Sequence, residues 1–430
     1  MRIAFINVTP GGSTGKIMSS TAEAAAKRGH ECIIFYGRGE AEQTKNDGSE
    51  ETVKSNENTQ NRETTENPVK KIKIEGKFDV LAHAFKARFL GRNGHGSKKA
   101  TKRLVQNLKN FDPDVIQLHN IHGYYINIEI LFDYLRNTRA KIYWTLHDCW
   151  TFTGGCAHFT AAKCEKWKTG CKKCQYRNVY PKSYPDTTKK EYEIKKNVFT
   201  GLTNLTLVTP CEWLKGLVKK SFLRDYECDC IPNGIDLNVF RGAQDEETEA
   251  DKRVALPGKY ILGVSSVWDE RKRPQMFIET AKILKKDGFS AVMIGKTDKT
   301  TRKAAKEAGN ILLFDRTENF GMLAEMYKNA VCLVSTSVED TFPTIGLESM
   351  ACGTPVVYAD VCGCPEQVEG DPVTGIVATP DDPNSFADAV RIIEKDARTF
   401  KENCEVKSKT KLSQEKMCER YLELYEREDQ

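Results

Sequence analysis

The chain has 430 residues, of which 39% are hydrophobic and 29% are charged, and its formal net charge is +5. This length predicts two domains. No apolar run approaches the roughly 18 residues of a membrane span. The mild net charge does not by itself indicate a nucleic-acid partner. Residues 1–12, MRIAFINVTPGG, are typical of a first buried strand rather than a signal peptide. The fifteen cysteines therefore favour the reducing cytosol, where clustered cysteines bind metal more often than they form disulfides.

Short apolar runs alternate with helical patterns along the chain. The runs typical of strands are RIAFINV, ECIIFYG, DVIQLHN, KIYWTLHD and LTLVTP in the first half, then YILGVSS, SAVMIG, ILLF, VCLVSTS and TPVVYAD. Strands that alternate with helices predict parallel, doubly wound sheets, and the restart after PNGID predicts two of them. The expected fold class is α/β with two parallel-sheet domains.

The expected domain boundaries follow from this restart. We place an N-terminal domain at 1–235, a second domain at 236–412, and a C-terminal helix at 413–430 that packs back on the N-terminal domain. Residues 39–68 hold almost no apolar side chain, so we expect a mobile loop there. Residues 156–174 form a Cys-rich segment of the first domain.

A glycine-rich loop, TPGGSTGKI, follows the first strand and opens the first helix. Its backbone N–H groups and the helix N-terminus can hold a phosphate. The spacing is not that of a Walker A motif, because Pro10 stands five residues before Gly15 and Ile17 follows Lys16. The loop also lacks the GxG of dinucleotide-binding proteins. A tight strand-to-helix turn explains the glycines equally well, so both interpretations stay open.

Residues 70–109 carry twelve Lys or Arg against two acidic residues. Within them, FDVLAHAFKARFL places apolar side chains at helical spacing, at Phe78, Leu81, Ala82, Phe85 and Phe89. A basic helix with an apolar face can lie on an anionic membrane surface. The alternative is a helix that packs into the core and exposes a basic face. The localisation we expect is cytoplasmic, with peripheral attachment to the inner membrane face as the further hypothesis.

The stretch from 145 to 174 combines two kinds of site residue. KIYWTLHD is a strand that ends in a polar pair, and ligand sites in parallel sheets lie at the carboxyl ends of strands. The cysteines that follow offer four thiols, and their CxxC end has the spacing of a tetrahedral zinc site. Structural zinc is the prediction, with disulfides and free thiols as the alternatives. The four candidate ligands are Cys156, Cys164, Cys171 and Cys174.

Two carboxylates stand eight residues apart in SVEDTFPTIGLESMACG. Asp340 is expected in a loop after a strand, and Glu348 along a short helix that ends at Gly353. Backbone N–H groups at the start of that helix can bind a diphosphate, and carboxylates suit sugar or ribose hydroxyls. A helix cap with a solvated glutamate is the alternative from spacing alone.

With these residues in view, the sequence resembles the retaining glycosyltransferases of family 4, whose GT-B fold consists of two facing Rossmann-like domains. The family pattern E-x7-E followed by EAMACGTPV appears here as Asp340-x7-Glu348 with ESMACGTPVV. CGCPEQV stands where the family has GGxPE, PNGID matches its PNGVD, and Gly11, Gly12 and Gly15 match its glycine loop. The resemblance runs along nearly the whole chain, but none of these motifs specifies a sugar.

The resemblance implies a role for each matched residue. His147 would hydrogen-bond the donor sugar near the reacting carbon, Asp340 would lie against that sugar, and Lys272 would contact the diphosphate. The family arginine five residues before the lysine is missing, and Arg271 or Arg273 would replace it. His119 and His122, near a comparable strand end, would shape the acceptor side. The expected donor-binding set is Gly12, Gly15, Arg271, Arg273, Glu339, Thr341, Phe342, Pro343, Thr344 and Glu348.

The function implied is retaining transfer of a sugar from a UDP- or GDP-sugar to a glycan or lipid-linked glycan in polysaccharide biosynthesis. No cofactor is expected for the chemistry, because cationic side chains and helix N-termini can stabilise a departing diphosphate. Most family members lack the Cys-rich insertion, so the resemblance does not assign it. The alternatives are a GT-B epimerase or phosphorylase, and a zinc-dependent nucleic-acid-binding protein. The last of these leaves the GT-B pattern unexplained, so no nucleic-acid partner is expected.

Overall fold

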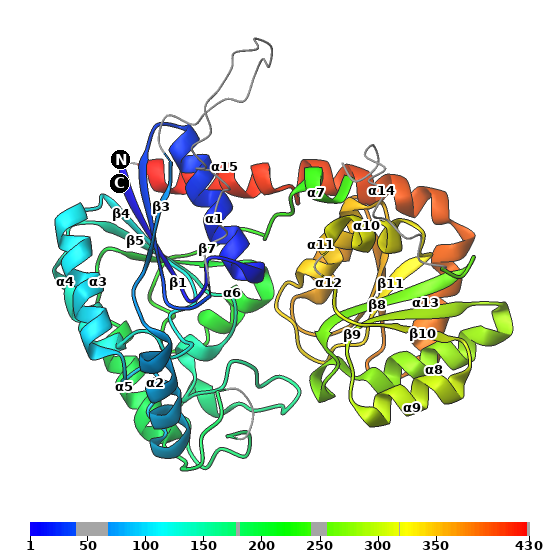
Figure 1. Ribbon diagram of the computed structural model, residues 1–430, viewed down its shortest axis with the longest axis horizontal. Helices are drawn as coiled ribbons and strands as arrows, with labels where there is room; N and C mark the ends of the chain where they lie inside the picture. Colours follow the sequence, from blue (N-terminus) through cyan, green and yellow to red (C-terminus); the bar gives the residue numbers. More distant parts are fainter. Residues whose placement is uncertain (40–67, 178–180, 242–255, 318, 428–430) are drawn as a thin grey trace, which may run out of the picture. The chain divides into compact units, whose positions relative to one another are not determined.

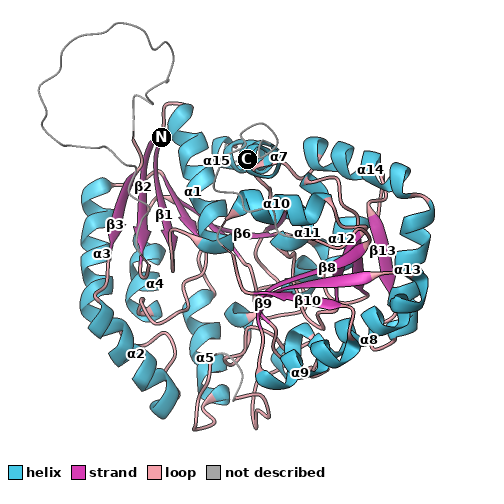
Figure 2. Ribbon diagram, turned by 45° about the vertical axis from the view of Figure 1, so that its right-hand side comes forward, coloured by secondary structure: helices cyan, strands magenta, loops and turns pink. Residues whose placement is uncertain are grey.

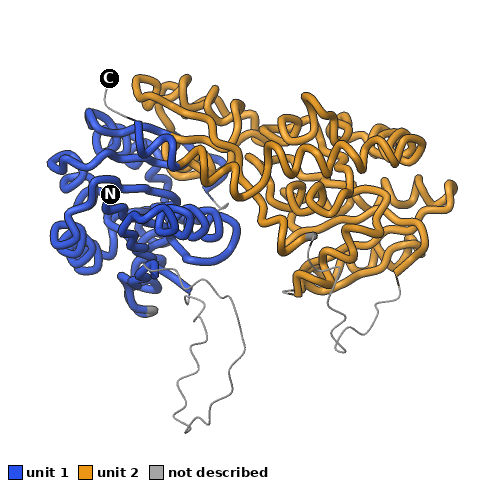
Figure 3. The backbone as a smooth tube through the Cα atoms, turned by 90° about the horizontal axis from the view of Figure 1, so that it is seen from above, with its two compact units in different colours: residues 1–145, 172–207, 422–430 blue, residues 146–171, 208–421 orange. Residues whose placement is uncertain are grey.

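The computed structural model describes residues 1–39, 68–177, 181–241, 256–317 and 319–427. The mobile loop predicted at 39–68 lies outside these ranges except for its two end residues. The chain divides into two compact units, shown in separate colours in Figure 3. Unit 1 comprises Met1–Thr145, Lys172–Leu207 and Leu422–Gln430, and unit 2 comprises Leu146–Cys171 and Val208–Tyr421. The domain boundaries expected from the sequence stay predictions.

The first sheet has the strand order β3-β2-β1-β4-β5-β6-β7 (Figure 1). Neighbouring strands from β3 through β5 pair in parallel. Strands β1, β2, β4 and β5 are buried almost throughout, as their apolar sequences predict, whereas β3 is a lysine-rich edge strand. The bounds are β1 Arg2–Asn7, β2 Glu31–Tyr36, β3 Lys70–Lys73, β4 Val115–Leu118, β5 Lys141–Thr145, β6 Leu205–Thr209 and β7 Cys228–Cys230.

The helices of unit 1 connect these strands. The first begins at the glycine loop and ends, as predicted, just before Gly29, which adopts a φ of +86°. The five helices are α1 Gly12–Lys27, α2 Lys77–Leu90, α3 Lys98–Phe111, α4 Ile128–Asn137 and α5 Thr188–Phe199.

The second sheet lies in unit 2, has the order β10-β9-β8-β11-β12-β13, and is parallel throughout. Numbered within the sheet, this order is 3-2-1-4-5-6, which is that of a Rossmann domain. Helices α8 and α9 cover one face, and α10 and α11 cover the other (Figure 2). The strands are β8 Tyr260–Val267, β9 Ser290–Lys296, β10 Ile311–Phe314, β11 Cys332–Ser335, β12 Val356–Ala359 and β13 Gly375–Ala378.

The remaining helices complete unit 2, and α15 passes from unit 2 into unit 1 at Leu422. They are α6 Glu212–Val218, α7 Leu237–Arg241, α8 Pro274–Leu284, α9 Lys299–Ala308, α10 Phe320–Lys328, α11 Thr344–Ala351, α12 Cys364–Val368, α13 Pro383–Lys395, α14 Ala397–Thr410 and α15 Gln414–Glu426. Short 3-10 turns lie at Trp150–Phe152, Lys166–Lys168, Glu270–Lys272 and Lys285–Asp287. Within the described ranges, no helix has both the length and the apolar character needed to cross a bilayer.

The strand order indicates where unit 2 binds a ligand. In open parallel sheets, ligands bind beyond the carboxyl ends of the strands, at the point where the strand order reverses. In the second sheet this point lies between β8 and β11. The loops that follow these two strands are therefore the first place to look for a site.

Candidate active site

The loop after β8 is shaped by a short 3-10 turn, Glu270–Lys272. Asp269 caps this turn, because its Oδ1 accepts a hydrogen bond from the backbone N of Lys272 at 3.2 Å. Thr336, in the loop after β11, donates from its Oγ1 to the Lys272 carbonyl oxygen at 2.9 Å. The neighbouring loop therefore fixes the backbone of Lys272.

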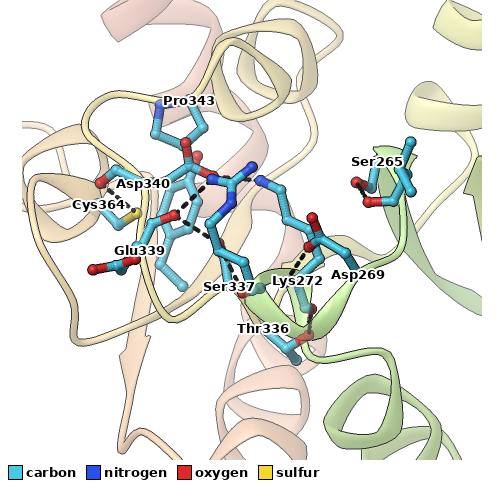
Figure 4. Close-up of polar contacts among 12 residues, drawn as sticks. Ser265, Asp269, Lys272, Thr336, Ser337, Glu339, Asp340, Pro343 and Cys364 are labelled. Atoms are coloured by element: carbon cyan, nitrogen blue, oxygen red, sulfur yellow. Dashed lines mark hydrogen bonds and ion pairs between the residues drawn. The ribbon is translucent and has the colours of Figure 1, made fainter. Parts of the chain in front are cut away.

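The side chain of Lys272 reaches the loop after β11. Its Nζ lies 2.5 Å from Asp340 Oδ2 (Figure 4), so the pair joins the carboxyl ends of the two strands at which the order reverses. Arg271 lies beside it, with Nη1 3.0 Å from the Glu339 carbonyl oxygen and 3.9 Å from the same Asp340 oxygen. Burial alone would raise the pKa of Asp340, but Lys272 and Arg271 hold this pKa below its ordinary value. The carboxylate is therefore ionised at neutral pH.

The next three residues lead into α11. Their carbonyl groups are held by three distant parts of unit 2: Cys211 Sγ donates to Thr341 O at 3.4 Å, Asn233 Nδ2 to Phe342 O at 3.2 Å, and Gln367 Nε2 to Pro343 O at 3.0 Å. Pro343 precedes the first helical residue, Thr344, and provides no side-chain cap. The helix thus begins beside Asp340 with its positive N-terminal end.

Two glycines allow this loop and helix to pack closely. A Cβ atom on Gly363, in the CGC sequence, would lie 2.1 Å from the Thr341 carbonyl oxygen. A Cβ atom on Gly346 would lie 1.9 Å from the hydroxyl oxygen of Tyr358. Both distances are far below van der Waals contact, so any larger residue at either position would displace the loop or α11.

Glu348 lies along α11, as the sequence predicts. Its Oε2 accepts a hydrogen bond at 3.0 Å from the hydroxyl of Tyr327, a buried residue of α10. Burial, followed by the proximity of Glu348, raises the pKa of Tyr327 well above its usual value. Tyr327 therefore stays protonated and orients the Glu348 carboxylate.

The other predicted site residues lie in several places. Arg273 has a φ of +52° and pairs with Asp381 on the surface. In unit 1, Gly15 lies so close to Pro10 that a Cβ atom would stand 2.6 Å from the Pro10 carbonyl carbon. Gly12 begins the same helix, with a φ of +71°.

The three predicted histidines follow strands of the first sheet. His119 comes directly after β4, where its carbonyl oxygen accepts a hydrogen bond from Trp144 Nε1 at 3.0 Å. His119 and His122 are buried in unit 1, whereas His147 is half-buried and belongs to unit 2. Next to His147, Asp148 Oδ1 accepts from Trp150 N at 2.8 Å and so stabilises the following 3-10 turn. These facts place the histidines near strand ends and leave their roles as predictions.

Comparison with known proteins identifies the region that carries the Lys272–Asp340 pair. The sequence model of the family described as "Glycosyl transferases group 1" matches residues 258–396. This region is a group 1 glycosyltransferase domain.

Similarity to curated proteins extends beyond this domain. The putative colanic acid biosynthesis glycosyl transferase WcaC of Escherichia coli K12 is 25% identical over 297 residues, which are 66% of this chain and 69% of WcaC. A D-inositol 3-phosphate glycosyltransferase of Paenarthrobacter aurescens is 26% identical over 225 residues, 50% of this chain and 54% of that relative.

Solved structures resemble the whole chain. The sucrose-phosphate synthase of Thermosynechococcus elongatus superposes with a TM-score of 0.66 at 15% identity, covering 99% of this chain and 98% of the other. Anabaena HepE in complex with UDP superposes with a TM-score of 0.64 at 12% identity, and the superposition covers 99% of each chain. At these identities the likeness shows the fold, which is the GT-B class of two Rossmann-like domains expected from the sequence.

The zinc prediction gains no support from the structure. Across the described residues, no group of three or more His, Cys, Asp or Glu is arranged to hold a metal ion. Cys171, one of the four candidate ligands, instead has its Sγ 3.1 Å from the backbone N of Gly154, which donates to it. Cys156, Cys164 and Cys174 are half-buried.

One feature of the site was missed from the sequence. The Leu146–Cys171 segment belongs to unit 2, and Ala161 N donates to Glu339 Oε1 at 2.7 Å. His158 in the same segment is an electrostatic neighbour of Asp340. The sequence holds no motif for this contact, because CAHFT matches no pattern of a ligand-binding loop.

Proposed function

We propose that the protein is a retaining glycosyltransferase that moves a sugar from a UDP- or GDP-sugar to a glycan or lipid-linked glycan in polysaccharide biosynthesis. The observation that carries the proposal is the Lys272–Asp340 pair at 2.5 Å, between the carboxyl ends of β8 and β11 in a group 1 domain. Similarity to a colanic acid glycosyl transferase supports the polysaccharide acceptor. The structural neighbour HepE, solved with UDP and with UDP-glucose, supports a nucleoside-diphosphate sugar as donor.

The charges around the pair suit a diphosphate. Arg271 and Lys272 supply two cations against the single Asp340 carboxylate, and the N-terminus of α11 adds a partial positive charge. Arg271 thus takes the place of the missing family arginine, whereas Arg273, paired with Asp381, does not. The ionised Asp340 accepts hydrogen bonds from sugar hydroxyls, and Glu348 accepts them from the ribose.

The proposed reaction breaks the bond between the anomeric carbon and the donor phosphate oxygen. Positive charge develops at that carbon, and negative charge develops on the diphosphate. Lys272, Arg271 and the start of α11 stabilise the negative charge by preorganised electrostatics, so no metal is needed for this step. The acceptor hydroxyl attacks the same face that the diphosphate leaves, and its proton passes to the leaving phosphate oxygen. His147 is assigned to the sugar near the reacting carbon, and His119 and His122 to the acceptor side.

Helix α2 supports the membrane part of the proposal. Its apolar residues Phe78, Leu81, Phe85 and Phe89 are all exposed, Phe78 by 88%, while His83 and Ala87 form the buried face. The helix therefore exposes the apolar side that a core-packing helix would bury. Exposed Lys98, Lys99, Lys102 and Arg103 follow on α3. An anionic membrane surface complements both features, and it would bring the enzyme to a lipid-linked acceptor.

A thermal-shift screen of UDP- and GDP-sugars tests the donor. A ligand that binds only the folded protein raises its melting temperature, and the nucleotide that does so identifies the donor class. Product analysis then separates the alternatives, since a glycosylated acceptor supports transfer and a free epimerised sugar supports an epimerase. Absence of any shift with either nucleotide series would contradict the proposal.

The ribose assignment has its own test. Glu348→Gln should weaken UDP binding about tenfold, because it removes the charge from an acceptor of ribose hydroxyls. The same change should have little effect on 2′,3′-dideoxy-UDP, which lacks those hydroxyls. Titration calorimetry of both ligands against both proteins measures this coupling, and equal losses for the two ligands would show that Glu348 does not contact the ribose.

A further inference from the structure

The Leu146–Cys171 segment has a small core of its own. Phe152, Phe159 and Trp167 are buried together, with the Trp167 ring centroid 5.4 Å from that of Phe152 and 5.1 Å from that of Phe159. Trp167 Nε1 donates to Cys164 O at 3.0 Å, and Thr153 Oγ1 donates to Cys156 O at 2.6 Å. The segment is therefore held in one shape by aromatic packing and hydrogen bonds.

This segment is attached to the acidic loop of the candidate site. The backbone N of Ala161 donates to Glu339 Oε1 at 2.7 Å, and the Glu339 side chain is buried. A buried carboxylate is costly unless it is hydrogen-bonded, so this contact stabilises Glu339 in its place. Glu339 thus anchors the segment, and the adjacent Asp340 is the carboxylate that faces Lys272.

The attachment holds the part of the segment that carries His158 against the acidic loop. On one side of His158, Ala157 O accepts a hydrogen bond from Cys149 N at 3.0 Å, and on the other side Phe159 belongs to the aromatic core. The electrostatic neighbours of the imidazole are Asp148, Arg271, Glu339 and Asp340.

The ring nitrogens of His158 are not committed to a hydrogen bond within the described part of the chain. Among the described residues, none makes a hydrogen bond to its ring nitrogens. Burial lowers the pKa of His158 below its ordinary value, so the ring is neutral at neutral pH and carries one donor and one acceptor nitrogen.

We propose that His158 is a specificity-determining residue that hydrogen-bonds a hydroxyl of the donor sugar while Asp340 binds a neighbouring hydroxyl. The proposal rests on the proposed function. Asp340 can only accept hydrogen bonds, so it holds any pair of suitably placed hydroxyls. A neutral imidazole fixed by its backbone adds a second point of contact, and this contact distinguishes sugars that differ in configuration at one carbon. The Leu146–Cys171 segment would thereby select the donor.

The test compares His158→Ala with the wild type. Titration calorimetry would measure the affinity of each protein for three ligands. These are UDP, the UDP-sugar that binds the wild type most tightly, and the epimer of that sugar nucleotide, for example UDP-glucose and UDP-galactose. The GDP series is used if the wild type prefers guanine. We expect His158→Ala to weaken binding of the preferred sugar nucleotide about tenfold, which is typical of the loss of one hydrogen bond, and to leave the affinity for UDP unchanged. The preference between epimers should fall by the same factor.

Controls separate this role from a structural one. His158→Gln, which keeps a donor and an acceptor, should restore part of the preference, and His30→Ala, at a surface ion pair in unit 1, should leave it intact. Melting temperatures within a few degrees of the wild type would show that the variants fold. Unchanged epimer preference in folded His158→Ala, or an equal loss for UDP itself, would overturn the proposal. A wild type that binds no sugar nucleotide would instead contradict the proposed function, and this inference would fail with it.

Discussion

Two adjacent acidic residues, Glu339 and Asp340, have different environments. Glu339 is buried and accepts a hydrogen bond from Ala161 N, whereas Asp340 is paired with Lys272. From the sequence, either residue could take the place of the first glutamate in the family pattern. The 3-10 turn after β8 brings Lys272 to the shorter Asp340, and this contact favours Asp340 over Glu339 for that place.

Replacement of Lys272 tests the electrostatic assignment. Lys272→Ala should lower kcat by roughly 100- to 1,000-fold, as does the loss of one preorganised charge-stabilising group in other enzymes. Lys286→Ala is the matched control, since Lys286 is exposed on the turn after α8 and should leave the rate unchanged. Steady-state transfer rates measure both, and similar rates for the two variants would show that Lys272 does not act on the diphosphate.

Glu75 predicts a pH dependence of stability. It is 4% exposed, and burial raises its pKa from 4.5 to about 7, with the neighbouring Ser97 and Arg103 opposing part of this rise. Between pH 4.5 and pH 7, the Glu75 carboxyl group is therefore protonated in the folded protein and ionised in the unfolded chain. The resulting stabilisation is complete below pH 4.5 and is lost as the pH rises through 7.

Glu75→Gln should remove this dependence. The wild type should lose up to about 3 kcal/mol of unfolding free energy relative to the variant between pH 5 and pH 8. Urea denaturation at both pH values measures it, with the exposed Glu227→Gln as control. A constant difference between wild type and Glu75→Gln would indicate that Glu75 ionises normally.

At the scale of elements, buried strands were predictable and polar or short ones were not. All ten apolar runs correspond to strands, because both faces of a parallel sheet are covered and its strands are apolar throughout. Strand β3, KKIK, was missed since an edge strand carries lysines, and β7 and β13 have only three and four residues. The helix at α2 was predicted, but the face that it exposes depends on the packing of His83 and Ala87, which periodicity does not reveal.

The exposed face of α2 predicts membrane binding. Phe78→Ser with Phe85→Ser should reduce sedimentation with anionic vesicles at least tenfold, because each buried Phe contributes about 1.5–3 kcal/mol. Replacement of Lys98, Lys99, Lys102 and Arg103 by Gln should weaken binding by roughly 1 kcal/mol per charge at low salt. Ile392→Ser, at an exposed apolar residue of α13, is the control. No sedimentation of the wild type with anionic vesicles at low salt would exclude this role of α2.

At the scale of the whole molecule, the sequence predicted two Rossmann-like sheets but not which unit each segment joins. The Leu146–Cys171 segment follows a strand of the first sheet, yet it belongs to unit 2. This assignment depends on contacts such as that of Ala161 with Glu339, over 178 residues of sequence. Long-range pairs of this kind leave no periodic signal in the chain.

The C-terminal residues complete the core of unit 1. The hydroxyl of Tyr425 donates to Gln117 Oε1 at 2.9 Å, and its ring lies 5.3 Å from that of Tyr143 between centroids. Tyr425→Ala should therefore lower the unfolding free energy by about 3–5 kcal/mol, the usual cost of removing a large buried aromatic ring. Tyr176→Ala, at an exposed tyrosine of unit 1, should lower the unfolding free energy far less. Denaturant unfolding measures both, and equal costs would show that the C-terminal segment does not stabilise unit 1.

The return of the chain to unit 1 has a consequence for biosynthesis. A ribosome makes proteins from the N-terminus, and domains formed from one continuous stretch can fold as they emerge. Unit 1 cannot do so, because its segment from Leu422 onward is translated after the whole of unit 2. The core beside its sheet therefore stays incomplete, with the Tyr143 ring and the Gln117 side chain uncovered, until all of unit 2 has been translated. Nascent chains halted before residue 422 should therefore expose apolar surface and depend on chaperones, whereas nascent chains that include the segment from Leu422 onward should lose that dependence.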